Sequence, residues 1–285
     1  MTMTATAPAT LSVIPDHRST KVGAVRTLAL RRLALTLRNP RSVAVPVLTP
    51  LLFALVIAPA LANTIAAPAG ANAYMTYVAL ATAGLLIPLN CMFSGLGVIV
   101  DRQQGAMREL LVAPIRRSSI VLGNLVAALA VTTGQLVVLI AASALRGATY
   151  TAGLHVLWFV GAALLFAILM YGLAEVLSTR LQSPEEYIGV LPVVAIVPFF
   201  FAGTLFPITS LPQWLDAVAK VLPLTHAMAL FRYGLTAHSG VQALHNIWGM
   251  SNAGVMALLS LAVVGLYALV VFVGAIRLFT RAGTS

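Results

Sequence analysis

Long apolar runs alternate with short basic stretches along this chain. Six of the runs approach or exceed the ~20 residues that a helix needs to cross a bilayer. They are Ser42 to Ala62, Tyr74 to Val100, Ile120 to Leu145, Leu154 to Leu177, Ile188 to Phe206 and Ala253 to Phe279. The pattern predicts an all-α, polytopic membrane protein with six transmembrane helices. Six crossings place both termini on the same side of the membrane.

The basic residues between the runs indicate which side that is. Of the 17 lysines and arginines, only Arg146, Lys220 and Arg232 fall on the side opposite to the termini. Loops rich in Lys and Arg stay in the cytoplasm. We therefore expect both termini to be cytoplasmic, in the plasma (inner) membrane of a bacterium.

The chain before the first run divides into two parts. Residues 1–20 are small, polar and contain proline, which predicts a disordered cytoplasmic tail. Residues 21–40 mix arginines with leucines and valines, which predicts an interfacial elbow helix on the headgroups. A direct continuation into the first span is the alternative, but Asn39 and Pro40 interrupt it. Residues 41–285 then form the six-span transmembrane domain.

Composition narrows the class of protein and its partners. Hydrophobic residues make up 60% of the chain, charged residues 8%, and the mean hydropathy is +0.98. A soluble domain has about a quarter charged residues, so a soluble fold is excluded. The net charge of +10 lies at the ends of apolar runs, which favours lipid headgroups over nucleic acid. Cys91 is the single cysteine, so no disulfide can form within the chain.

A few polar residues and prolines interrupt the runs. Asn90 and Gln135 are candidates for a transport path, although Gln135 could equally bridge two helices. Glu175 lies near the end of its run, and we expect it to reach the interface or pair with Arg180. The alternative role for Glu175 is that of a proton carrier. Kinks or breaks are expected at Pro46, Pro50, Pro59, Pro88, Pro192 and Pro198.

The charged stretch from Asp101 to Ser119 separates the second and third runs. Met107, Leu110 and Leu111 are spaced i, i+3 and i+4, which predicts one apolar stripe on a helix over Ala106 to Ala113. Other faces of the helix carry Arg108 and Glu109, and Pro114 ends it. We expect the stripe to be a knob that a partner grips, since such a helix could move both adjoining spans. The alternative is a helix or turn resting on the headgroups.

A second short-helix region is predicted at residues 207–251. Its first helix is expected from Ser210, as N-cap, to Leu222, and its second from Thr225, after Pro223, to Phe231. Neither is long enough to span, so both should dip into the outer leaflet or lie on it, with Trp214 at the interface. The spacing of His226, His238 and His245 does not predict a metal site.

These two regions carry a family resemblance. The segment DRQQGAMRELLVAPIRRSSIVLGN resembles the cytoplasmic coupling region of the type-two ABC exporter permeases, especially the daunorubicin-resistance group. Residues that fit are Gly105, Leu110, Leu111, Pro114 and Gly123, whereas Gln103, Gln104 and Asn124 depart from the pattern. The segment from Phe201 to Arg232 resembles the family's re-entrant outer helices, and its LPLTH is similar to the nodulation-factor export branch.

The resemblance implies the membrane subunit of an ATP-driven exporter of an amphipathic drug, antibiotic, lipid or glycolipid. It implies a second permease chain, as homodimer or heterodimer, and a separate ATP-binding subunit. No GxxxxGK[ST] loop occurs, so we expect no cofactor here, with ATP and Mg bound by that partner. An ion-coupled secondary transporter using Glu175 is the rival. Coupling to the ATPase is assigned to residues 101–118, through Gly105, Met107, Arg108, Glu109, Leu110, Leu111 and Pro114. The residues assigned to the outer re-entrant region are Pro207, Trp214, Pro223 and His226.

Overall fold

The computed structural model describes residues 21–38, Ala44, Leu48, Leu52, Leu55, Val56, Ala60 and 71–282. The predicted tail and almost all of the predicted first span lie outside the described residues. Every regular element within the described residues is a helix. In order they are α1 (Lys21–Arg38), α4 (Ala71–Gln103), α5 (Ala106–Val112), α6 (Arg117–Leu145), α7 (Val156–Arg180), α8 (Pro184–Ala195), α9 (Val197–Phe201), the 3-10 helix η2 (Ile208–Ser210), α10 (Gln213–Val221), α11 (Pro223–Leu235), α12 (Ala237–Trp248) and α13 (Ala253–Ala282).

The long helices confirm an all-α polytopic membrane protein. Five helical segments among the described residues are long and apolar enough to cross a membrane, or six if the bent pair α10 and α11 counts as one. The five are α4, α6, α7, α8 with α9, and α13. Each matches one of the last five predicted runs, because an apolar run of this length forms a helix that satisfies its own backbone in lipid.

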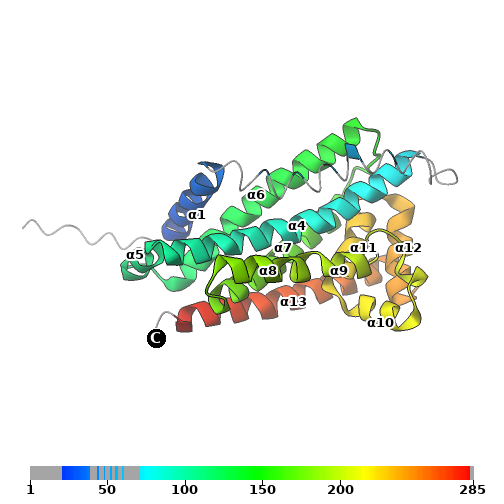
Figure 1. The fold of residues 1–285 in the computed structure, drawn as a ribbon. Coiled ribbons are helices and arrows are strands. Elements are labelled where there is room, and N and C mark those ends of the chain that lie inside the picture. The colour runs from blue at the N-terminus through cyan, green and yellow to red at the C-terminus, as the bar shows by residue number, and fades with distance from the viewer. Residues whose placement is uncertain are drawn as a thin grey trace, which may run out of the picture.

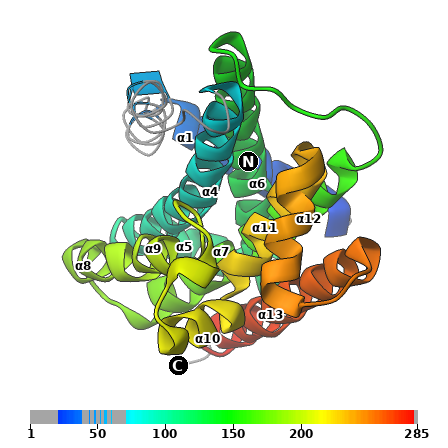
Figure 2. The ribbon, with the colours of Figure 1, turned by 90° about the vertical axis from the view of Figure 1, so that its right-hand side faces the viewer.

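The long helices form a bundle with different short helices at its two ends. The central helix α7 packs against α4, α11 and α13. Figure 1 shows α4 and α13 running along the bundle, with α5 at one end and α10, α11 and α12 at the other. Figure 2, seen from the second end, shows α8 and α13 on opposite sides and α11 between them. We call these the α5 end and the α11 end.

The predicted fifth span is broken, and it begins at Pro184 instead of Ile188. Its helix is interrupted at Ile196, before Pro198, and ends at Phe201 instead of Phe206. The chain then turns at Gly203, whose φ of 68° is in the left-handed region that favours glycine. Pro88, in contrast, lies inside the single helix α4. The turn at Gly203 leads the chain into the short helices of the α11 end.

Those short helices begin and end at other residues than predicted. Ser210 is not a helix cap but the last residue of η2, and α10 begins at Gln213. Leu211 precedes Pro212 and is held in an extended conformation (ψ 154°), which delays the helix start. Thr225 is likewise not a cap, since α11 begins at Pro223 and continues past Phe231 to Leu235. The two helices meet at 79°.

Candidate functional site

The turn between α4 and α5 depends on a glycine. Gly105 precedes α5 with φ 81°, a conformation that costs other residues about 1 kcal/mol or more. At the other end, Ala113 is extended (ψ 145°) because it precedes Pro114, so the helix ends at Val112. Residues at both ends thus explain why a short separate helix interrupts the path from α4 to α6.

The apolar stripe of α5 faces the protein's own bundle. Met107 is buried, with 8% of its surface exposed, and Leu110 and Leu111 pack half-buried against the same core. Met107 therefore does not project toward a partner, whereas the coupling role assigned to this stretch stays a prediction. The outward face of α5 consists of Arg108, Glu109 and Val112, and Val112 is 87% exposed.

A buried ion pair holds α1 against α4 next to α5. Arg32 Nη1 donates to Asp101 Oδ2 at 2.7 Å, and the guanidinium also reaches the carbonyl oxygens of Ser94 (3.2 Å) and Gly97 (3.4 Å). A Cβ atom at Gly97 would lie 1.7 Å from Arg32 Nη2, so only glycine leaves room for the guanidinium. Arg32 therefore points into the bundle and not toward the headgroups, where a helix lying on the membrane surface was expected to place its arginines.

The rest of α1 lies along α6. Leu28 faces Gly123, where an added Cβ would come within 2.6 Å of Leu28 Cβ, so this glycine lets the two helices approach closely. Beside this contact is an apolar groove of about 630 Å³ between α1 and α6, lined in part by Leu30, Leu33 and Val126. A helix with arginines and exposed leucines on its outer face suits a membrane surface.

Two further arginines join neighbouring helix ends to the α5 end. Arg102 Nη2 donates to the carbonyl oxygen of Leu181, just beyond α7, at 2.6 Å. Arg117 Nη1 donates to the carbonyl oxygen of Thr280, near the end of α13, at 3.0 Å. A displacement of α5 would therefore pull on α4 and α6 directly, and on α7 and α13 through these bonds.

The predicted path residues are buried inside the bundle. Asn90 on α4 is 9% exposed and Gln135 on α6 is 6% exposed. Neither lines the α1–α6 groove or the pocket described below. Their assignment to a transport path remains a prediction.

Glu175 is placed differently from expectation. It is fully buried, its Oε2 accepts a hydrogen bond from Tyr171 at 2.9 Å, and its Oε1 has no partner. It forms no ion pair with Arg180, which is exposed. The pairing prediction is wrong because residues five apart point about 140° from each other on a helix, whereas i and i+4 are neighbours. The Glu175 side chain does not reach the membrane interface either, because it is fully buried.

At the α11 end, two of the predicted outer-region residues lie in different environments. Trp214 on α10 is 68% exposed, as suits an interface. His226 is buried. Its Nε2 donates to the carbonyl oxygen of Lys220 (2.9 Å), and its Nδ1 lies 3.3 Å from Ser260 Oγ. Trp248 Nε1 donates to the same Ser260 Oγ at 2.8 Å, so this cluster joins α11, α12 and α13.

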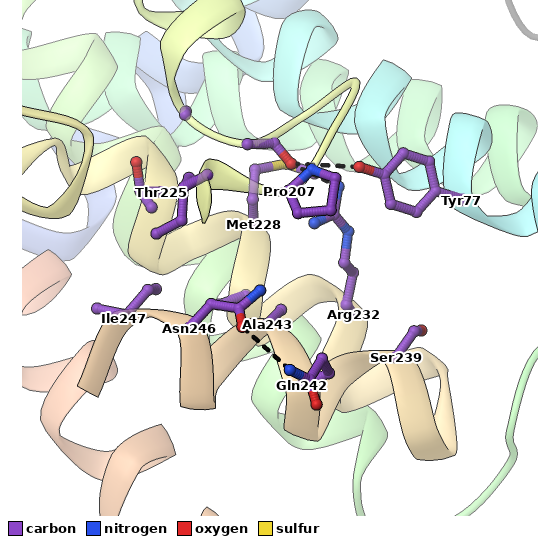
Figure 3. Close-up of a pocket in the computed structure, with 14 residues that line it drawn as sticks. Tyr77, Pro207, Thr225, Met228, Arg232, Ser239, Gln242, Ala243, Asn246 and Ile247 are labelled. Atoms are coloured by element: carbon purple, nitrogen blue, oxygen red, sulfur yellow. Dashed lines mark hydrogen bonds between the residues drawn. The ribbon is translucent and has the colours of Figure 1, made fainter. Parts of the chain in front are cut away.

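Pro207 lines a pocket at the α11 end. The pocket has a volume of about 180 Å³ and lies between α11, α12 and the chain that follows α9. Figure 3 shows Pro207 close to Tyr77 and to the side chain of Arg232. Neither Arg232 nor α12 was singled out by the sequence analysis. The apolar spacing of Val241, Leu244 and Trp248 could have revealed α12.

Comparison with known proteins places most of the chain in one family. The family model of the ABC-2 type transporters matches residues 23–236. The transport permease ycf38 of Porphyra purpurea is 31% identical over 142 residues, which cover 49% of this chain and 48% of the relative. The multidrug ABC transporter permease YbhR of Escherichia coli K12 is 29% identical over 139 residues, 47% of this chain and 36% of the relative. The matched part is thus half or less of each relative's length.

Proposed function

The chain belongs to the ABC-2 type transporter family, and on this basis we propose that it is the membrane-spanning permease subunit of an ATP-driven exporter. In this proposal the chain is a membrane transport permease, which agrees with the names of its relatives. The observation that carries the proposal is α5. This helix sits between two spanning helices, is anchored by a buried stripe and presents an exposed face at one end of the bundle.

The exposed face of α5 is where the ATP-binding subunit docks in this proposal. Val112 supplies an apolar contact, and Arg108 and Glu109 supply charges at its rim. Because Met107 fixes α5 to the bundle, a partner that moves this face moves α4 and α6 with it. ATP and Mg bind in the partner, and this chain converts the motion of its bundle into transport.

The proposed setting follows from charge and from the relatives. The α5 end, rich in arginine, faces the cytoplasm of a bacterium, with both termini on that side of the inner membrane. The cargo is an amphipathic drug, antibiotic, lipid or glycolipid, and one Escherichia coli relative carries the name multidrug permease. A second permease chain, identical or different, completes the assembly.

The direct test is ATP hydrolysis by purified components in liposomes. We expect no hydrolysis from this chain alone and Mg-dependent hydrolysis when the ATP-binding protein of its transport system is added. A further increase is expected when cargo is present. Hydrolysis by the highly purified lone chain would overturn the subunit role.

Glu175 supports one rival, an ion-coupled secondary transporter. A fully buried carboxyl group with an unpartnered oxygen inside a spanning helix is a feature that proton carriers share. Efflux of a fluorescent amphipathic dye from intact cells separates the two functions. The exporter loses efflux when ATP is depleted, resists an uncoupler at constant ATP and tolerates Glu175→Gln. A secondary carrier keeps efflux when ATP is depleted, loses it when an uncoupler is added and loses it with Glu175→Gln.

A further inference from the structure

A buried arginine is the central feature of the pocket at the α11 end. Arg232 is only 7% exposed. Its Nη2 donates to the carbonyl oxygens of Gly203 (2.8 Å) and Thr204 (3.0 Å), and its guanidinium lies 4.1 Å from the centre of the Tyr77 ring. Its Nε has no hydrogen-bond partner. These contacts orient the side chain, but none of them supplies a negative charge.

No acidic side chain that the structure describes compensates this charge. Asp216 is the only acidic residue after Glu186 in the sequence, and it pairs with Lys220 at 2.8 Å. A buried cation is costly unless an anion lies close to it, and in membrane proteins such residues are commonly functional. The site is therefore electrostatically incomplete within the described part of the chain.

The pocket next to Arg232 has the room and the polar lining to receive an anion. Its volume of about 180 Å³ is several times the roughly 30 Å³ that one water occupies in the liquid. Ser239, Gln242 and Asn246 line it from α12. Gln242 Nε2 donates to Asn246 Oδ1 at 3.1 Å, which leaves the Asn246 amide hydrogens available. Figure 3 shows Gln242 and Asn246 on α12, across the pocket from Pro207 and Tyr77.

We propose that this pocket binds the oxyanion group, phosphate or carboxylate, of an amphipathic molecule, with Arg232 as its counter-charge and Asn246 as a hydrogen-bond donor. The apolar part of the ligand lies along Ile208, Met228 and Ile247, which also line the pocket. Such a molecule is either a lipid with an anionic head group or a cargo that carries the same group. The inference goes beyond the proposed export role and does not depend on the ATP-binding partner.

A purely structural role for Arg232 makes a different prediction. In that case the guanidinium only anchors the turn at Gly203 and Thr204, and the pocket has no preference for an anion. A carboxylate placed on the pocket wall separates the two cases. Asn246→Asp keeps the size of the side chain and places a carboxylate in the pocket that Arg232 also lines, so it should disfavour an external anion and leave the turn intact.

The experiment measures binding of dodecyl phosphate to the full chain in dodecyl maltoside, by calorimetry and by thermal unfolding. We expect saturable binding and a rise in the melting temperature for the native protein. Asn246→Asp should weaken binding at least tenfold and melt no lower than the native protein without ligand. Arg232→Gln should abolish binding. Arg146→Gln, a matched change at an exposed arginine, should bind as the native protein does.

Two results overturn the proposal. One is equal binding to the native protein and to Asn246→Asp, which remains decisive even if Arg232→Gln fails to fold. The other is binding of inorganic phosphate as tight as that of dodecyl phosphate, which would make the pocket a site for a free anion. With the native protein, phosphatidylglycerol in place of dodecyl phosphate tests the lipid source. Failure to bind it, with dodecyl phosphate bound, assigns the site to cargo.

Discussion

The ion pair between Arg32 and Asp101 should decide whether α1 stays docked on the bundle. The two side chains are 11% and 12% exposed and meet at 2.7 Å. Asp101→Ala removes the carboxylate and leaves the guanidinium buried, which is the costly way to break such a pair. The carbonyl oxygens of Ser94 and Gly97 remain, but at 3.2 and 3.4 Å they are distant acceptors.

The size of the effect follows from that geometry. Breaking a buried pair by removing one partner costs about 3 to 5 kcal/mol. Because two carbonyl acceptors remain and both side chains keep some exposure, we take about 3 kcal/mol for local release of α1. At 1.4 kcal/mol per factor of ten, the population of released α1 rises on the order of 100-fold. Replacing both residues, as in Arg32→Met with Asp101→Leu, should restore most of the loss.

Thiol labelling of α1 measures this release. Leu28 is 9% exposed and packs against Gly123 of α6, so Leu28→Cys in a Cys91→Ser background reports on undocking. If closing is faster than labelling, the labelling rate follows the population of the open state. We expect a rate on the order of 100-fold higher with Asp101→Ala. Glu109→Ala, which removes an exposed acid nearby, should leave the rate unchanged. A change of less than threefold with Asp101→Ala would show that the ion pair does not hold α1 on the bundle.

Two other predictions test the packing and the orientation. Gly240→Ala should destabilise the fold by about 1 to 3 kcal/mol, because its Cβ would lie 2.2 Å from Tyr233 Cα. The control is Gly134→Ala, whose Cβ would meet nothing within 4 Å. Thermal unfolding compares the two variants, and equal stability would contradict the packing of α11 on α12. Gln213→Cys in a Cys91→Ser background should react with an impermeant thiol reagent added outside intact cells, and reaction only after lysis would invert the topology.

Sequence reasoning located the elements better than their surroundings. The last five predicted spans were found because run length determines whether a helix can cross lipid. Pro114 similarly marked the end of α5, since the residue before a proline does not continue a helix. The spacing of the stripe on α5 showed which residues share a face, but it carries no information on whether that face meets the bundle or a partner. Only the structure shows that Met107 is buried.

Contacts between distant residues were the part that sequence could not provide. Arg32 and Asp101 are 69 positions apart, and nothing in either local pattern identifies the other as its partner. The prediction for Glu175 was wrong for a related reason, since the surroundings of this side chain are determined by the helices that pack around α7. The local sequence around Arg232 does not indicate that its side chain is buried. Its burial depends on the turn at Gly203, which returns the chain over α11.

In the function proposed above, an ATP-binding partner drives this permease through the exposed face of α5. The most direct test is the amount of partner that co-purifies with Val112→Asp, compared with Val241→Asp at the α11 end. A charge at a dry interface anchor costs about 1 to 3 kcal/mol, so Val112→Asp should retain about a tenth of the partner or less. Val241→Asp should retain all of it. Full retention by Val112→Asp, with transport intact, would show that the partner does not dock on this face of α5.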